Sequence, residues 1–161
     1  MRAAVLTIST SVARGANVDA SGALLARLAE QAGVEVVARD VVPDEQARIE
    51  ERLRAYVAED LRFAFTTGGT GLTPDDVTPE ATRAVIDRDA PGFAEALRAE
   101  SVRQTPMGVL TRGVSGIAGR TLIVNFPGSP RAVQQLFGVI APALAHAAQT
   151  LARDPGGSSG H

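Results

Sequence analysis

A glycine-rich segment between a strand-like run and a helix-like run is the part of the chain best suited to chemistry. It extends from Thr66 to Thr82 with the sequence TTGGTGLTPDDVTPEAT. Gly68, Gly69 and Gly71 lack a Cβ atom, so backbone N–H groups can surround an anionic group there. The neighbouring threonines add hydroxyl donors. A tight turn that needs only flexible residues would explain the same glycines equally well, because the pattern is neither a P-loop nor the dinucleotide-binding GxGxxG.

Acidic residues follow this loop at Asp75 and Asp76. A carboxylate beside a phosphate site repels the ligand unless a divalent cation lies between them, and Mg²⁺ sites use one or two carboxylates together with substrate phosphates. Asp44 is expected at the same edge of the sheet if the topology is doubly wound. Simpler roles are also open: Asp44 as the N-cap of a helix and Asp75 as a solvated loop residue.

A second segment rich in turn residues, NFPGSP at Asn125–Pro130, also follows an expected strand and precedes an expected helix. Gly128, Ser129 and the helix start form a second candidate anion site, although a capped helix start explains the pattern equally well. Arg98 is expected either to meet a phosphate or to pair with Glu95. The two histidines, His146 and His161, have no partner that suggests a metal site or a catalytic triad.

The elements that must position these residues alternate along the chain, which predicts an α/β domain with a largely parallel sheet. The expected strands are Ala3–Ile8, Val34–Val42, Leu61–Thr66, Gly113–Ala118 and Thr121–Asn125, the last two joined as a hairpin at Gly119-Arg120. Helices are expected over Ser21–Ala32, after Asp44, from a Thr78 cap, over Phe93–Arg103 and after Ser129, with a break at Pro142.

Composition narrows the function classes. The 161 residues predict one domain over 1–153, followed by a polar, glycine-rich tail over 154–161 that is expected to be disordered. All 16 basic residues are arginine, against 18 acidic ones, and the net charge of −2 argues against generic binding to nucleic acid or an anionic membrane. The absence of cysteine excludes disulfides and a cysteine nucleophile. With no signal peptide or membrane span in the sequence, a cytoplasmic location is expected.

Taken together, the segments resemble the MogA/MoaB family of molybdenum cofactor biosynthesis in their order and spacing. The matching motifs are TTGGTG at Thr66–Gly71, DVTPEAT at Asp76–Thr82, PGFAEALR at Pro91–Arg98, NFPGSP at Asn125–Pro130 and VPDEQ at Val42–Gln46. The similarity extends from about Val5 to about Leu151. It implies a three-layer α/β/α molybdopterin-binding fold and a homotrimer.

The same resemblance implies an activity, namely Mg²⁺-dependent transfer of AMP from ATP to molybdopterin with release of pyrophosphate. Asp44 and Asp76 match the two functionally important acidic positions of the family, so they are expected to be catalytic and to hold the metal. The positions expected to bind substrate are Ser9, Thr67, Gly68, Gly69, Thr70, Gly71, Asn125, Pro127, Gly128 and Ser129.

One departure from the family pattern keeps a second function open. Some members carry Ser-Asp-Arg after the first strand, whereas this chain has Ser9-Thr10-Ser11, with Arg14 three residues further on. The alternative is a non-catalytic, MoaB-like protein that binds molybdopterin and assists molybdenum insertion, with a molybdenum insertase as a further partner. The presence of both Asp44 and Asp76 favours the enzyme, because a protein that only binds the pterin does not need a metal there.

Overall fold

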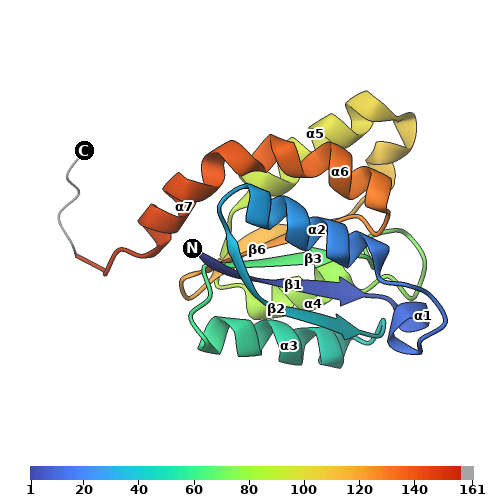
Figure 1. The fold of residues 1–161 in the computed structure, drawn as a ribbon, viewed down its shortest axis with the longest axis horizontal. Helices are drawn as coiled ribbons and strands as arrows, with labels where there is room; N and C mark the ends of the chain where they lie inside the picture. Colours follow the sequence, from blue (N-terminus) through green and yellow to red (C-terminus); the bar gives the residue numbers. More distant parts are fainter. Residues whose placement is uncertain (157–161) are drawn as a thin grey trace.

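A six-stranded mixed sheet forms the centre of the computed structural model, which describes residues 1–156 (Figure 1). The strand order is β2-β1-β3-β6-β5-β4; the first four strands in this order are parallel, and β5 is antiparallel to both of its neighbours. The strands are β1 (Arg2–Ile8), β2 (Glu35–Val42), β3 (Phe63–Thr67), β4 (Arg88–Asp89), β5 (Ser115–Ala118) and β6 (Thr121–Phe126). The predicted α/β fold with a largely parallel sheet is confirmed.

Helices cover both faces of this sheet, as Figure 1 shows, with α2, α5, α6 and α7 on one side and α3 and α4 on the other. The helical elements are α1 (Thr10–Ala13), α2 (Ala20–Gln31), α3 (Gln46–Ala58), α4 (Thr78–Val85), α5 (Pro91–Gln104), the 3₁₀ turn η1 (Pro106–Leu110), α6 (Pro130–Ile140), the 3₁₀ turn η2 (Ala141–Ala143) and α7 (Leu144–Leu151). None of the helices in the described part has the length and apolar character that a membrane crossing requires.

Alternation along the strands divides the core into two layers, because successive side chains of a strand point to opposite faces. Phe63 and Phe65 of β3 face α2 and α6, and Phe65 meets Phe137 of α6 edge to face at 5.8 Å between ring centroids. Ala64, between them, faces α3 and α4, where Tyr56 of α3 is buried. This double cover makes the central strands rigid supports for the loops at their ends.

Most predicted elements are present, with shifted ends. The hairpin of β5 and β6 turns at Gly119, whose φ of +59° is the left-handed value that favours glycine. The expected break at Pro142 is confirmed, because α6 ends at Ile140 and η2 precedes α7. The short elements α1, β4 and η1 were not predicted, since they are too brief for a periodic pattern.

The C-terminal tail is described only in part. The prediction of disorder covered residues 154–161, of which 157–161 lie outside the described residues. Asp154, at the start of that range, accepts a hydrogen bond from Arg120 at 2.8 Å.

Candidate active site

A cavity of about 460 Å³ lies at the carboxyl ends of the central strands. The register places these ends side by side, because Ile8 pairs with Val42, Thr7 with Thr67, and Thr67 with Phe126. The arrowheads of β1 and β2 in Figure 1 point to this edge, next to α1. The chain leaves β1 toward β2 on one side, while β3 lies on the other, so the cavity occupies the switch point where open α/β sheets bind their ligands.

The lining of the cavity comes from five separate segments. They are the end of β1 with the loop after it, the start of α2, the loop before α3, the glycine-rich loop after β3, and the start of α6. The lining residues are Thr7, Ile8, Ser9, Ser11, Val12, Asn17, Val18, Asp19, Ala20, Ser21, Asp44, Thr67, Gly68, Gly69, Asp76, Gly128 and Pro130.

The glycine-rich loop has left-handed backbone at two successive residues, with φ of +100° at Gly68 and +69° at Gly69. A Cβ atom at Gly68 would collide with the carbonyl oxygen of Ile8, and one at Gly69 would collide with the Thr78 hydroxyl. These glycines are therefore required by conformation and by close approach of β1 and α4. The tight-turn interpretation of the sequence holds, and the same two residues also line the cavity.

A buried layer of polar side chains supports this loop from below. The Asn125 side chain, 3% exposed as a residue, donates to the hydroxyls of Thr66 and Thr82, both at 3.0 Å, and accepts from the Val114 backbone N–H at 3.1 Å. Every polar atom of its amide group is thereby engaged. The structure places Asn125 in this supporting layer and outside the cavity lining.

Thr67, which was expected to donate to a ligand, and Thr78, which was expected to cap a helix, both donate to backbone carbonyls. The Thr67 hydroxyl donates to the Pro127 carbonyl at 2.7 Å, which ties the two candidate loops together. Thr78 donates to the Gly68 carbonyl at 2.9 Å. The expected Thr78 cap is wrong by one position, because Val77 is the N-cap residue and has no side-chain cap bond; the loop contact has taken the Thr78 hydroxyl.

Asp44 reaches the cavity from the loop before α3. Its Oδ2 accepts hydrogen bonds from the backbone N–H and the hydroxyl of Thr10, both at 3.0 Å, and the Asp44 backbone N–H donates to the same hydroxyl at 3.0 Å. The expectation that Asp44 caps the helix is wrong: Glu45 is the N-cap residue of α3, without a side-chain cap bond. The carboxylate instead joins its loop to the one after β1.

Asp76 reaches the cavity from the other side, at the end of the glycine-rich loop. Its Oδ2 accepts from the backbone N–H of Thr73 at 3.0 Å and from the Thr73 hydroxyl at 2.8 Å. Gly71 must be small here, since a Cβ atom would lie 2.8 Å from that oxygen. The fold thus brings both predicted acids, Asp44 and Asp76, to one cavity, whereas Asp75 is exposed outside its lining.

A third acid, Asp19, lines the same cavity and was not among the predicted site residues. It is the N-cap of α2 and accepts from the Gly22 N–H at 3.0 Å and from the Thr7 hydroxyl at 2.9 Å. The Asp19 Oδ2 atom also forms an ion pair with Arg39, with 3.5 Å to its Nη2 atom. The sequence signal was an Asp before an amphipathic helix, which indicates a cap; its place at the cavity follows only from the position of α2 beside β1.

The first loop folds into the short helix α1, with Ser9 as its N-cap. The Ser9 hydroxyl accepts from the Val12 N–H at 3.3 Å and lies 3.2 Å from the Ser11 hydroxyl. Both serines line the cavity, as expected for Ser9.

The NFPGSP segment contributes to the site with its backbone. Ser129 is the N-cap of α6, accepting from the Ala132 N–H at 3.1 Å, so the predicted cap is confirmed. Gly128 and Pro130 line the cavity. The predicted substrate-binding positions outside the lining are Thr70, Gly71, Asn125, Pro127 and Ser129.

Charge in the cavity has one sign. Among the described residues that line it, Asp19, Asp44 and Asp76 are acidic and none is arginine, lysine or histidine. An anionic phosphate is repelled by such a wall unless a cation comes with it. The start of α6 offers partial positive charge at the same cavity.

The donor set fits a magnesium ion that arrives with its phosphates. In the described part of the chain, no group of three or more His, Cys, Asp or Glu residues could hold a metal ion by itself. Mg²⁺ does not need such a cage, because it is bound through one or two carboxylates plus substrate phosphates and water. Asp44 and Asp76, on opposite loops of one cavity, match this requirement.

Two arginines outside the cavity lining contact the protein in ways that the sequence did not predict. Arg98 does not pair with Glu95 but donates to the carbonyls of Thr111 at 3.1 Å and Gly113 at 3.2 Å; its expected contact with a phosphate stays a prediction. Arg112 forms a bidentate pair with Glu80. This pair lowers the pKa of Glu80, because hydrogen bonding to the guanidinium favours the charged carboxylate.

Comparison with known proteins links this geometry to cofactor biosynthesis. Residues 4–146 match the family described as "Probable molybdopterin binding domain". The chain is 42% identical over 153 residues to the molybdenum cofactor synthesis protein cinnamon of Drosophila melanogaster, covering 93% of this chain and 25% of that protein. It is 38% identical over 146 residues to molybdenum cofactor biosynthesis protein B of Escherichia coli, covering 89% of this chain and 85% of the other.

A third relative is named for an activity, the molybdopterin adenylyltransferase of Haemophilus influenzae, with 45% identity over 96 residues, 59% of this chain and 49% of the relative. The solved structure of MoaB from Thermus thermophilus superposes with a TM-score of 0.89 at 41% identity, covering 96% of this chain and 98% of the other. A structure of MogA gives a TM-score of 0.90 at 41% identity, with 94% and 100% coverage. The chain thus spans about a quarter of cinnamon and nearly the full length of the MoaB and MogA chains.

Proposed function

The chain belongs to the molybdopterin-binding domain family of molybdenum cofactor biosynthesis, and from this premise we propose that it transfers AMP from ATP to molybdopterin. The observation that carries the proposal is the pairing of Asp44 and Asp76 across one cavity whose lining has no basic side chain. Two carboxylates in the cavity repel an anionic pterin phosphate unless a divalent cation takes part.

In the proposed reaction an oxygen of the pterin's terminal phosphate attacks the α-phosphorus of ATP. A new P–O bond joins AMP to the pterin phosphate, the bond between the α-phosphorus and the bridging oxygen breaks, and pyrophosphate leaves with that oxygen. Bound Mg²⁺ would supply neutralisation of the charge on the phosphates. Nucleotidyl transfer of this kind depends on positioning and on electrostatic stabilisation more than on a covalent catalyst.

The residues of the chain have separate roles in this scheme. Asp76, together with Asp44, would hold the metal and its triphosphate. The backbone of Gly69 would orient the pterin phosphate for in-line attack, whereas the Gly68 N–H already donates to the Phe126 carbonyl at 3.1 Å. Gly128 and the start of α6 lie on the same cavity and would add N–H donors and partial positive charge. Relatives named molybdopterin adenylyltransferase support this assignment.

A non-catalytic, MoaB-like binding role is the second candidate, and one observation favours it. Each carboxylate already has a local structural role, since Asp44 binds Thr10 and Asp76 binds Thr73. A scaffold protein that serves molybdenum insertion would need the same loop contacts without any chemistry. The relative named molybdenum cofactor biosynthesis protein B fits this candidate as well.

The test is incubation of the purified protein with molybdopterin, ATP and Mg²⁺, followed by mass spectrometry for adenylylated pterin and for pyrophosphate. Magnesium-dependent product would establish the transferase. Folded protein that binds molybdopterin but forms no product under these conditions would move the function to binding.

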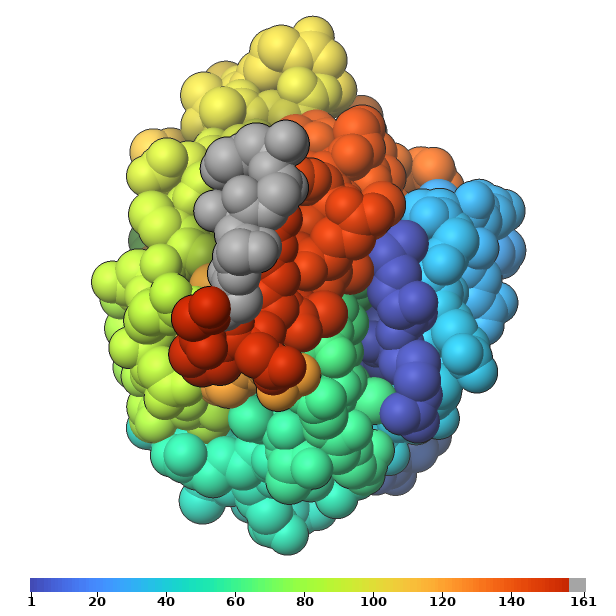
Figure 2. Space-filling model, turned by 90° about the vertical axis from the view of Figure 1, so that its left-hand side faces the viewer, coloured from blue at the N-terminus to red at the C-terminus, as the bar shows by residue number. Residues whose placement is uncertain are grey.

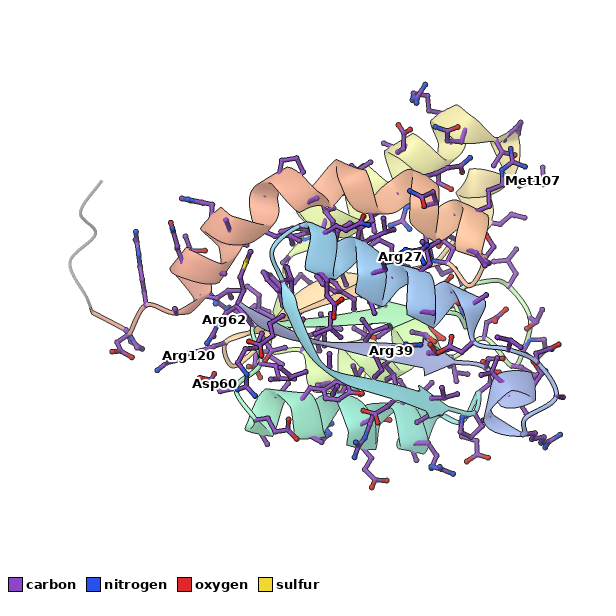
Figure 3. All side chains as sticks on the ribbon, in the orientation of Figure 1. Arg27, Arg39, Asp60, Arg62, Met107 and Arg120 are labelled. Atoms are coloured by element: carbon purple, nitrogen blue, oxygen red, sulfur yellow. The ribbon has the colours of Figure 1, made fainter. Side chains whose placement is uncertain are left out.

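Assembly and location are part of the same proposal. The homotrimer implied by the resemblance needs an apolar surface, and Met107, Val109 and Leu110 are 64%, 66% and 43% exposed on the projection of α5 and η1. In Figure 2 this projection forms the yellow top of the molecule, and Figure 3 shows Met107 at its outer end. Light scattering coupled to size exclusion gives the oligomer mass. A cytoplasmic location and an insertase partner stay predictions.

A further inference from the structure

Arg112 directs its whole side chain to the segment that carries Asp76. Its Nε donates to the Gly71 carbonyl at 2.8 Å, and its Nη2 donates to the Asp76 carbonyl at 2.7 Å. The same guanidinium holds Glu80, in the first turn of α4, at 2.8 Å. In addition, the Arg112 backbone N–H donates to the Thr70 carbonyl at 2.8 Å. One residue therefore ties down the loop at its start, at its end and at the helix that follows.

The loop itself has little else to hold it. Residues 72–75 are exposed, and the side chain of Asp76 is oriented by Thr73, which lies within the same exposed stretch. The Thr73 contact fixes the carboxylate relative to the loop, whereas the Arg112 contacts fix the loop relative to α4 and the sheet. The position of the Asp76 carboxylate at the cavity depends on both.

Global stability does not account for this arrangement. The side chains of Arg112 and Glu80 are 36% and 43% exposed, and ion pairs with that much solvent contribute little to the free energy of unfolding. A planar guanidinium with several fixed donors is, however, well suited to holding backbone carbonyls at set positions. The effect of Arg112 is therefore concentrated on the geometry of one loop.

We propose that Arg112 is a positioning residue of the active site, which holds the 70–80 segment so that the Asp76 carboxylate meets the metal–triphosphate group. This inference rests on the proposed function, because it gives Asp76 a ligand. Lysine cannot replace the arginine, since an ammonium group is a point charge and cannot reach Gly71, Asp76 and Glu80 together.

The first experiment compares wild type with Arg112→Lys. The readout without turnover is Mn²⁺ binding in the presence of ATP and without pterin, followed by electron paramagnetic resonance. We expect Mn²⁺ to bind about tenfold more weakly, and kcat for AMP transfer to fall about 10- to 100-fold with little change in the KM for molybdopterin, as for other residues that orient a metal ligand. The melting temperature should stay within a few degrees of wild type.

A matched control is Arg62→Lys at the opposite edge of the sheet. The Arg62 guanidinium also donates to a backbone carbonyl, that of Arg120, at 2.8 Å and pairs with Asp60 at 3.5 Å. Figure 3 shows Arg62, Asp60 and Arg120 together, near the N-terminus. Mn²⁺ binding and kcat should be unchanged in this variant.

A double-mutant cycle separates positioning from general structure. If Arg112 acts through Asp76, then adding Arg112→Lys to Asp76→Asn should cause no further loss of Mn²⁺ affinity or kcat. Additive losses, or an Arg112→Lys protein with wild-type Mn²⁺ affinity, would overturn the proposal. If Arg112→Lys does not fold, Glu80→Gln serves in its place, since it weakens the same anchor, and an unchanged Mn²⁺ affinity there would overturn the proposal too.

Measurements on the wild type distinguish a failure of the proposed AMP transfer from a failure of the role proposed for Arg112. Protein that binds Mn²⁺ with ATP but never adenylylates molybdopterin contradicts the proposed function, while the role of Arg112 is still decided by the Mn²⁺ measurements. Protein that holds no Mn²⁺ with ATP overturns the Arg112 proposal as well, because there is then no metal to meet Asp76.

Discussion

Two cavities of similar size lie at the two ends of the parallel strands. They differ in whether their acidic residues are paired with basic ones. The cavity at the carboxyl edge has about 460 Å³, and the one at the amino edge, lined by Met1, Arg2, Asp60, Arg62 and four residues of α7 and its C-cap, has about 540 Å³. At the amino edge Arg62 pairs with Asp60 and donates to a carbonyl, so acid and base satisfy one another. At the carboxyl edge the carboxylates of Asp44 and Asp76 accept hydrogen bonds only from threonines among the described residues.

Volume therefore does not distinguish the candidate active site from the other cavity, whereas the pairing of their charged residues does. Matched charges at the amino edge are explained by the fold itself. Asp19, Asp44 and Asp76 line the other cavity, and only Asp19 has a basic partner, Arg39, at 3.5 Å outside the lining. A bound cation would compensate the charge of the other two. This contrast leads to four tests, ordered from the largest expected effect to the smallest.

The largest effect is expected from Asp76→Asn against Asp60→Asn. Both changes remove one carboxylate from a loop, and asparagine tolerates the left-handed backbone of Asp60, whose φ is +55°. If the proposed function holds, Asp76→Asn should lower the rate of AMP transfer about 10²- to 10³-fold, because the proposed metal ligand is lost, whereas Asp60→Asn should keep full activity. Rates are measured by chromatography of the adenylylated pterin. Equal activity of the two variants would show that the cavity with Asp76 has no more to do with the reaction than the cavity with Asp60.

Gly68→Ala should destabilise the protein strongly. The φ of +100° and the collision with the Ile8 carbonyl together predict a loss of about 3 kcal/mol in the free energy of unfolding. Gly92→Ala is the matched control, because a Cβ atom there meets nothing within 4 Å in helix α5, and it should stabilise by up to about 1 kcal/mol. Urea unfolding of both variants gives the comparison, and a neutral Gly68→Ala would show that the loop is not constrained.

Asn125→Ala tests the supporting layer beneath the site. It leaves the buried Val114 N–H without its acceptor and the Thr66 hydroxyl without its donor, while the Thr82 hydroxyl keeps its bond to the Thr78 carbonyl. The two lost contacts predict a loss of about 2 kcal/mol. Exposed Asn17→Ala, in the first loop, is the control, and its cost should stay below about 1 kcal/mol. Thermal unfolding measures both, and an Asn125→Ala protein as stable as the control would contradict the supporting role.

The smallest effect concerns pH. The pKa of Glu80 is lowered by its hydrogen bonds with Arg112, so the folded state is stabilised above the ordinary value of 4.5 and loses this contribution as the pH falls through the lowered pKa. Glu80→Gln should therefore be less stable than wild type at pH 7, by less than about 1 kcal/mol because the pair is exposed, and the difference should vanish in acid. A difference that grew on acidification would contradict this sign. Melting temperatures at pH 7 and pH 3 provide the measurement.

The sequence predicted the fold better than it predicted the roles of single side chains. Period-two and period-3.6 patterns reach over whole elements, so β1, β3 and α6 were placed to within a few residues. Asp44 was expected at the same sheet edge if the topology was doubly wound, because parallel strands end at one edge. Its convergence with Asp76 was not predicted and follows from the cavity lining. The predictions of helix caps were less accurate. Ser129 is the N-cap of α6 as predicted, whereas the side chain of Asp44 contacts Thr10 and that of Thr78 contacts Gly68.

What the sequence could not show depends on contacts between loops. Asn125 was expected to touch substrate, but its side chain is used by Thr66 of β3 and Thr82 of α4, which are 59 and 43 residues away along the chain. Arg112 lies in an irregular stretch without a periodic pattern, and its partners Glu80 and Gly71 are 32 and 41 residues away. Asp19 gave only a cap signal. Such pairings arise from strand order, which local propensity does not encode.

The hydrogen bond from the Gly68 N–H to the Phe126 carbonyl has a consequence for the synthesis of the polypeptide itself. The floor of the cavity is closed by the end of β6, so a nascent polypeptide that has emerged only as far as Thr67 lacks Gly68, Gly128 and the closed cavity. A ligand that binds only the closed floor stabilises chains that include β6 and leaves shorter ones unprotected. Occupancy of this cavity would in this way report that synthesis has passed β6, and chains truncated before it would meet proteolysis without a bound ligand.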